Sequence, residues 1–225
     1  MEMCKLILET LIKALKKKFE EDDRKGIHVS DLTLCPRKSI FDRLENKKLS
    51  MRDLNFFTSG RGIHDSIQIL AKENGDYEIE KEVEKDGIIG HIDLYDKKNN
   101  IPIECKSMRV KELKYPKSHH IDQLASYMAL TNSKKGILLY QLLLHYDDKP
   151  FVEFEYEATD AELANRKIWL INRAKKYAEV LKKQLSPMEM LGVFNNPNLN
   201  WLCRSCSHRI QCELNESETN EMSDK

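Results

Sequence analysis

The chain lacks net charge, and it lacks any long apolar segment. Its 37 lysines and arginines balance 37 aspartates and glutamates, so the formal net charge is zero. Extensive nonspecific binding of DNA usually goes with a basic surplus, and this balance argues against it. No apolar run approaches the length that crosses a bilayer and no signal peptide is recognisable, so we expect a cytoplasmic protein with no membrane partner.

The chain does contain two short alternating segments that carry two carboxylates and a lysine. Residues 90–95 and 101–106 alternate as strands do, so side chains two apart share a face. Glu104 and Lys106 therefore point the same way. The polar residues between the two segments are typical of a hairpin loop. Closing this hairpin is expected to bring Asp93 beside Glu104.

Two adjacent carboxylates and a lysine suit metal-dependent cleavage of a phosphodiester. Mg²⁺ and Mn²⁺ prefer carboxylate, carbonyl and water oxygens. A bound ion lowers the pKa of a water and neutralises charge that builds on phosphate oxygens. Lys106 can orient the attacking water and offset the same negative charge. The alternative is a surface hairpin with solvated charges, because a Glu-x-Lys triplet is common in a chain that is 33% charged.

Two segments with helical character carry further polar residues. His64 ends the segment 58–64, and a histidine on a helix is by itself most often structural. Gln123 and Tyr127 stand four residues apart in a helix expected over 119–131, so they share one face. That face either lines a site or forms the polar edge of a half-buried amphipathic helix.

The order of these residues resembles the PD-(D/E)XK nuclease superfamily, in its RecB-like branch. The shared pattern is Asp-x10-Glu-x-Lys, with Gly-x-x-Asp before it and Gln-x-x-x-Tyr after it, and Gly-His-Ile-Asp replaces Pro-Asp here. The segment that ends at His64 is similar to the Gly-x-x-x-His helix of this branch. The resemblance implies that His64, Asp93 and Glu104 bind Mn²⁺ or Mg²⁺. It also implies that Gln123 and Tyr127 contact substrate or water.

Cysteine placement forms a second pattern. The six cysteines are Cys4, Cys35, Cys105, Cys203, Cys206 and Cys212. The last three form Cys-x2-Cys-x5-Cys, a spacing that lets thiolates reach one metal centre. Cys35 is the best candidate for a fourth ligand, and Cys4 has no assignable partner. Cys105 is expected in the core by strand alternation, although its backbone carbonyl lies beside Glu104 and is a candidate ligand of the catalytic metal.

On spacing alone, four thiolates suit zinc and an iron–sulfur cluster equally well, and His208 can substitute for one cysteine in a zinc site. Disulfides are a third alternative, which the expected intracellular location disfavours. The one-plus-three layout resembles the CRISPR-associated iron–sulfur exonucleases of the RecB-like branch (the Cas four family), over residues 27–213. The resemblance implies a [4Fe–4S] cluster held by Cys35, Cys203, Cys206 and Cys212.

The succession of helical and strand patterns predicts an α/β fold, a restriction-endonuclease-like core in which helices flank a central mixed sheet. Helices are expected at 2–23, from a Ser30 cap to Leu44, from a Thr58 or Ser59 cap to Glu73, at 119–131 and from Thr159 to Gln184. Strands are expected at 77–85, 87–95, 101–107, 136–146 and 152–158. We predict four regions: N-terminal helices that supply one cluster cysteine (1–57), the nuclease core (58–184), a C-terminal iron–sulfur segment (185–215) and a frayed tail (216–225).

The resemblance implies a metal-dependent exonuclease that hydrolyses single-stranded DNA, often 5′-to-3′. Relatives prepare the DNA fragments that become CRISPR spacers and work with integrase proteins, and they include monomers and rings. The cluster is expected to be structural, and the basic residues 109–117 are expected near DNA phosphates. Other functions stay open: a stand-alone repair or viral nuclease, a non-catalytic zinc-containing DNA-binding module, or a structural subunit of a larger complex.

Overall fold

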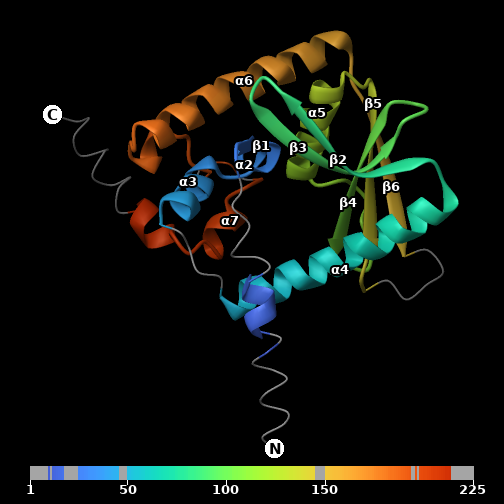
Figure 1. Ribbon diagram of the computed structural model, residues 1–225, viewed down its shortest axis with the longest axis horizontal. Helices are drawn as coiled ribbons and strands as arrows, with labels where there is room; N and C mark the ends of the chain where they lie inside the picture. Colours follow the sequence, from blue (N-terminus) through green and yellow to red (C-terminus); the bar gives the residue numbers. More distant parts are fainter. Residues whose placement is uncertain are drawn as a thin grey trace, which may run out of the picture.

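The structure, a computed structural model, describes residues 10, 12–17, 25–45, 50–144, 150–193, 196 and 198–213. Figure 1 shows the order of its elements along the chain. They are β1 (Ile27–His28), α2 (Val29–Thr33), α3 (Pro36–Leu44), α4 (Met51–Asn74), β2 (Tyr77–Lys85), β3 (Ile88–Asp96), β4 (Ile101–Met108), α5 (Ser118–Thr131), β5 (Lys135–Leu142), β6 (Phe151–Glu157), α6 (Asp160–Lys182), the 3₁₀ turn η1 (Pro187–Glu189) and α7 (Trp201–Arg204).

β3 is the central strand of a six-stranded mixed sheet. It pairs antiparallel with β2, and its first residues pair parallel with β1. Its last three residues pair antiparallel with β4, which runs parallel to β5, and β6 closes the sheet antiparallel to β5. The ladder between β3 and β4 begins at Leu94 opposite Ile103. The two strands therefore part next to Asp93 and Glu104, and this split creates room for a site.

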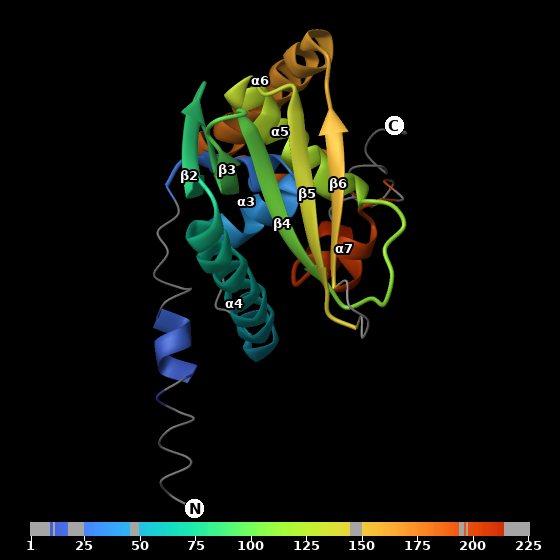
Figure 2. The same cartoon turned by 90° about the vertical axis from the view of Figure 1, so that its right-hand side faces the viewer.

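Helices cover both faces of the sheet (Figures 1 and 2). On one face, Ile67 of α4 packs with Leu94, Ile103 and Cys105. On the other face, α5 packs its apolar side against β5, and α6 in turn covers α5. In Figure 1, α6 runs along the top of the molecule and α4 along the bottom, with the strands between them. The expected mixed sheet flanked by helices is confirmed.

The N-terminal helices α2 and α3 dock on α6 through a buried carboxylate. Asp31 accepts hydrogen bonds from the backbone N–H of His28 (2.8 Å), the hydroxyl of Ser39 (2.7 Å) and the guanidinium of Arg43 (2.7 Å). The Ser39 hydroxyl also lies 2.7 Å from the hydroxyl of Tyr177 on α6. A buried carboxylate needs such partners, and this set holds α2, α3 and α6 together.

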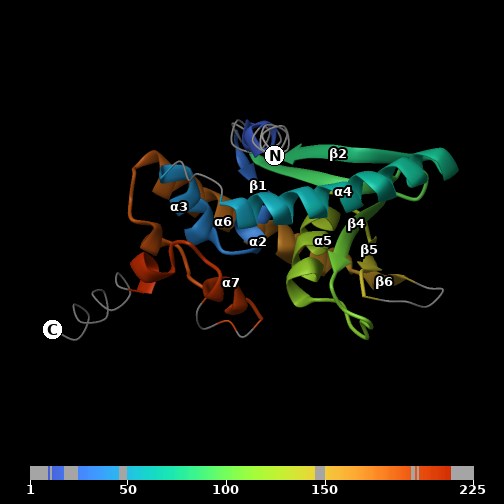
Figure 3. The ribbon, with the colours of Figure 1, turned by 90° about the horizontal axis from the view of Figure 1, so that it is seen from below.

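The C-terminal segment returns to these same helices. Arg37 of α3 donates from Nε to the carbonyl of Met190 at 2.6 Å, across 153 positions of sequence. His208 is buried against α3 and stacks on Phe41 with a ring separation of 5.0 Å. Figures 1 and 3 show α3 and the segment around α7 gathered at the end of the molecule opposite β6.

The five core strands expected from alternation are confirmed, although β5 ends at Leu142 rather than 146. The helix expected from Ser30 to Leu44 is wrong, because α2 ends at Thr33 and α3 begins at Pro36. Between them Cys35 adopts an extended backbone, and proline, which has no N–H, sits at the first position of the new helix. The break places Cys35 at a helix start.

The cap expected at Thr58 or Ser59 is also wrong. α4 begins two turns earlier, where Ser50 and Asp53 form a reciprocal capping box. The expected boundary between residues 57 and 58 therefore falls inside α4. Of the helix expected over 2–23, residues 10 and 12–17 are described and helical, and the rest lies outside the described residues. Within the described part of the chain, no helix is both long and apolar enough to span a membrane.

Candidate metal centre and cysteine cavity

Asp93 lies at the split between β3 and β4. Its Oδ2 accepts a 2.7 Å hydrogen bond from the backbone N–H of Cys105, and its Oδ1 lies 3.4 Å from Nδ1 of His64 on α4. The N–H and the carbonyl of one strand residue face the same neighbouring strand. The Cys105 carbonyl therefore also faces the split, while its thiol lies in the core against α4.

Glu104 is the most deeply buried acid of the described residues, with 1% of its surface exposed. Its Oε1 accepts a hydrogen bond from the ammonium of Lys106. Its Oε2 is buried and has no hydrogen-bond partner among the described residues. Burial, followed by repulsion from Asp93, raises the pKa of Glu104 to about 7, and attraction to Lys106 only partly offsets this rise. A buried, unpartnered carboxylate oxygen indicates a missing partner with positive charge.

Two basic side chains lie beside the two carboxyl groups, and the carboxyl groups raise the pKa of both. Burial opposes the charged form of Lys106, but Glu104 and Asp93 outweigh burial and raise the pKa of its ammonium. Burial likewise lowers the pKa of His64, whereas its contact with Asp93 raises it by more, so the net shift is upward. Two acids therefore lie next to two protonatable bases. Carboxylates are ligand types that a hard divalent ion prefers.

Gln123 and Tyr127 lie beside this group on α5. Nε2 of Gln123 donates a 3.0 Å hydrogen bond to the hydroxyl of Tyr127. The Tyr127 ring packs on Gly90 of β3, where a Cβ atom would lie only 3.0 Å from it. Gly90 opens the Gly-His-Ile-Asp segment, so the glycine provides the space that lets α5 approach the split. The structure thus pairs His64 with Asp93 and Lys106 with Glu104, and it places Tyr127, which is bonded to Gln123, on β3 three residues before Asp93.

Two residues near Asp93 were missed by sequence reasoning. Nε2 of Gln68 lies 3.3 Å from the carbonyl of Asp93 and donates to Oε1 of Glu80 at 2.8 Å. Glu80 has a positive φ of 50°, which is uncommon outside glycine and often marks a functional position. Gln68 follows His64 by four residues on the same helical face, and this spacing was a usable signal.

A histidine pair at the start of α5 was also missed. Nδ1 of His120 lies 2.8 Å from the hydroxyl of Tyr140, whose backbone pairs with Lys106. Burial and the nearby ammonium of Lys106 keep the pKa of His120 far below its usual range, so its ring is neutral. His119 lies 5.4 Å, between ring centres, from Trp201 of α7. The cysteine segment therefore touches the helix that carries Gln123.

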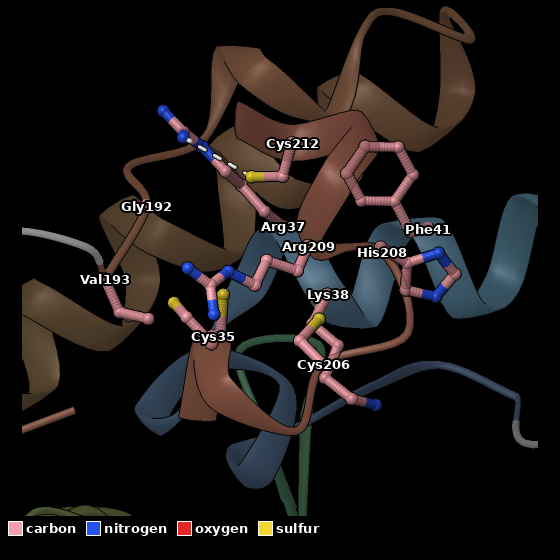
Figure 4. Close-up of a pocket in the computed structure, with 11 residues that line it drawn as sticks. Cys35, Arg37, Lys38, Phe41, Gly192, Val193, Cys206, His208, Arg209 and Cys212 are labelled. Carbon is pink, nitrogen blue, oxygen red and sulfur yellow. Dashed lines mark hydrogen bonds between the residues drawn. The ribbon is translucent and has the colours of Figure 1, made fainter. Parts of the chain in front are cut away.

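Four cysteines line one cavity between α3 and the C-terminal segment. Cys35 comes from the start of α3, and Cys203, Cys206 and Cys212 come from the C-terminal segment. Figure 4 shows Arg37 beside the Cys212 sulfur, and its Nη1 lies 3.8 Å from that sulfur. All five cysteines in the described residues are free thiols. Burial raises the pKa of the Cys35 and Cys203 thiols.

The cavity suits a soft metal centre by its donor types, since four thiols and a guanidinium donor surround it. His208 also lines the cavity, but its two ring nitrogens lie 2.8 Å from Asp42 and 3.2 Å from Glu45. Its ring is thus held on α3 and is not free to replace a cysteine. In the arrangement that the structure describes for residues 25–45, 50–144, 150–193 and 198–213, no three His, Cys, Asp or Glu side chains already converge closely enough to hold an ion.

Comparison with solved structures identifies the class of fold. The crystal structure of SSO0001 superposes with a TM-score of 0.65 and 25% sequence identity, and the match covers 92% of this chain and 96% of that one. The alkaline exonuclease LHK-Exo from Laribacter hongkongensis superposes with a TM-score of 0.54, over 71% of this chain and 91% of that one. At 14% identity, this second match shows a shared exonuclease-like fold only.

Comparison of sequences adds a particular relative. The CRISPR-associated exonuclease Cas4 of Saccharolobus solfataricus is 28% identical over 216 residues, which cover 88% of this chain and 95% of the relative. No protein-family model matches the chain. The resemblance to the CRISPR-associated RecB-like exonucleases, predicted from the motifs, is confirmed by this similarity.

Proposed function

We propose that the chain is a metal-dependent DNA exonuclease whose centre is the split between β3 and β4. The observation that carries the proposal is the buried Oε2 atom of Glu104, which has no partner among the described residues. Asp93, Lys106 and His64 lie close enough to act on the charge of this carboxylate. The similarity to an exonuclease over most of the chain supports the same activity.

Asp93, Glu104, His64 and the Cys105 carbonyl would hold Mn²⁺ or Mg²⁺. When bound, the ion would neutralise charge on the phosphate and make a bound water more acidic. Lys106, already beside Glu104, would keep its proton and direct the ammonium at the attacking water or the phosphate oxygens. Gln123 and Tyr127 would position the strand from α5 through their mutually hydrogen-bonded polar ends. Burial of the pocket would strengthen each of these charge interactions.

The finer parts of the proposal follow the relative. We infer single-stranded DNA as substrate, a 5′-to-3′ direction, and a cytoplasmic role in CRISPR spacer acquisition together with integrase proteins. The relative is named a CRISPR-associated exonuclease, which supports the exonuclease and the CRISPR setting. The basic residues 109–117 directly follow β4, the strand that carries Glu104 and Lys106. We propose that they contact DNA phosphates.

We also propose that Cys35, Cys203, Cys206 and Cys212 hold a [4Fe–4S] cluster with a structural role. The cluster would join α3 to the C-terminal segment, whose Trp201 touches α5. Zinc is the competing occupant. A cluster gives broad visible absorption and equimolar iron and acid-labile sulfide, whereas zinc gives a colourless protein with neither, so absorption and elemental analysis of anaerobically purified protein decide between them.

The test of the nuclease compares wild type with Glu104→Gln on single-stranded DNA in Mn²⁺, using strands labelled at the 5′ or the 3′ end. The matched control is Glu84→Gln, an exposed glutamate on β2. We expect wild type and the control to degrade DNA and Glu104→Gln to lose at least about a hundredfold in rate. The order in which each label is released gives the direction. DNA binding without cleavage by wild type would contradict the proposal and favour a non-catalytic binding module.

A further inference from the structure

A second concave site lies between α5 and α6. It has a volume of about 570 Å³ and opens on the surface of the molecule. Its polar lining includes Asp122 on α5, Tyr156 on β6, Arg166 and Arg173 on α6, and Asn196 in the loop that leads to the cysteines. We refer to it as the α5–α6 cleft. None of the residues assigned above to the metal centre or the cysteine cavity lines it.

The floor of the cleft combines one indole with two guanidinium groups. Arg166, Trp169 and Arg173 share a face of α6, since they stand three and seven residues apart. The guanidinium carbons of Arg166 and Arg173 lie 5.0 Å and 4.6 Å from the centre of the Trp169 ring. Both guanidinium groups therefore lie within the distance at which a cation is attracted to an aromatic ring.

Two acids, Asp122 and Glu162, and two arginines line the cleft, and one guanidinium nitrogen has no hydrogen-bond partner among the described residues. Arg166 donates to Asp122 Oδ1 at 2.7 Å, so this pair is neutral. Glu162 is used by the capping box of α6, where its carboxylate accepts from the N–H and hydroxyl of Thr159. Arg173 remains, and its Nε is buried with no hydrogen-bond partner among the described residues. Burial lowers the pKa of this guanidinium, and Cys35 and Asp122 only partly offset the effect. A buried N–H donor without an acceptor is costly, and the oxygens of a phosphate would supply one.

The cleft is connected through the chain to both sites described above. Asp122, which lines the cleft, directly precedes Gln123 on α5. Cys35 lies close enough to Arg173 for a charge on its sulfur to act on the guanidinium, and Asn196 precedes the cysteine segment.

We propose that the α5–α6 cleft binds a nucleotide of single-stranded DNA outside the cleavage position, with its phosphate on Arg173 and its base against Trp169. Bidentate pairing with phosphate and stacking on an aromatic ring are the two contacts that single-strand binding requires. Asp122 keeps Arg166 from taking a second phosphate, so one phosphate is expected. The proposal rests on the nuclease function, and its test measures binding rather than cleavage.

The test uses the full-length holoprotein with Glu104→Gln, so that no DNA is cut. Binding of fluorescent oligothymidylates of about 6 and about 20 nucleotides is measured by anisotropy at several salt concentrations. Arg173→Gln should weaken binding of the longer strand about tenfold and reduce the slope of log Kd against log salt by about 0.7, the value for one phosphate on a single strand. The shorter strand should bind equally well to both proteins. Lys175→Gln, which removes an exposed charge from the same helix, should change neither quantity.

Two further measurements separate this site from a folding defect and from a mononucleotide site. Arg173→Lys keeps the charge, so it should restore the salt slope but not the full affinity. In Trp201→Phe, Trp169 is the remaining tryptophan, and the longer strand should quench its emission. An unchanged slope in Arg173→Gln, or no quenching, would overturn the proposal whether or not wild type cuts DNA. Quenching by thymidine monophosphate at the affinity of the longer strand would show a mononucleotide site and would also overturn it.

Discussion

The charge of Glu104 is expected to destabilise the metal-free protein at neutral pH. Its pKa is about 7 in the folded chain, whereas a solvated glutamate has 4.5. A raised pKa means that the folded state holds the proton more tightly than the unfolded state, so stability falls as pH rises from about 4.5 to about 7 and is constant above that range. At about 1.4 kcal/mol per pH unit, the loss is about 3 kcal/mol.

Glu104→Gln keeps the shape of the side chain and removes this charge. With a chelator present at about pH 8, the variant should therefore be more stable to urea than wild type, by up to about 3 kcal/mol. At about pH 5 the two proteins should unfold at nearly the same urea concentration, because wild type is then mostly protonated at Glu104. The measurement is urea unfolding followed by circular dichroism, with Glu84→Gln as a control that should show no pH-dependent difference.

Addition of Mn²⁺ should make wild type more stable than Glu104→Gln at about pH 8. An ion that binds only the folded state stabilises it by about 4.1 kcal/mol at about a thousand times its Kd, which exceeds the difference of about 3 kcal/mol. Wild type should gain this stability, and Glu104→Gln should gain much less. Two results would refute the account of a buried, metal-seeking carboxylate: a variant less stable than wild type at about pH 8 in chelator, or a difference that does not change with pH.

Further predictions concern the support of both centres. Gly90→Ala should displace Tyr127, because the new Cβ would lie 3.0 Å from its ring, so cleavage should fall about tenfold while Mn²⁺ affinity measured by titration stays unchanged. Gly192→Ala should reduce the metal content of the cysteine cavity, because the new Cβ would lie 2.5 Å from the Arg37 guanidinium. The control is Gly62→Ala, whose new Cβ meets open space and should leave the metal content unchanged. Equal metal content in the two variants would contradict this role of Arg37. Cys203→Ala should lose the bound metal and lower the Tm by several degrees in calorimetry; full occupancy and an unchanged Tm would exclude a structural cluster. Since the pKa of His64 is raised and a ligand must be neutral, Mn²⁺ affinity in calorimetric titration should increase with pH through that pKa, and it should lose this dependence in His64→Ala.

Much of the candidate site was predictable because its rules are local. Alternation placed β2 at residues 77–85 without error, and the polar loop closed the hairpin in the register that sets Asp93 opposite Glu104. Local patterns predicted the wrong helix boundaries at two places, where a proline or a capping box determined the boundary. Pro36 divided the helix expected from Ser30, and the capping box at Ser50 started α4 earlier than expected.

The sequence by itself determined which residue types meet in the hairpin and which cysteine spacing is present, because turn chemistry and a two-residue period act over a few positions. Tertiary structure alone decided that Glu104 is buried with one oxygen unpaired and that His64 reaches Asp93 from a helix on another layer. It also decided that Arg37 meets Met190 and that Nε of Arg173 has no hydrogen-bond partner among the described residues. Burial and such long-range contacts depend on how whole elements pack, and no periodicity in a short segment encodes that packing.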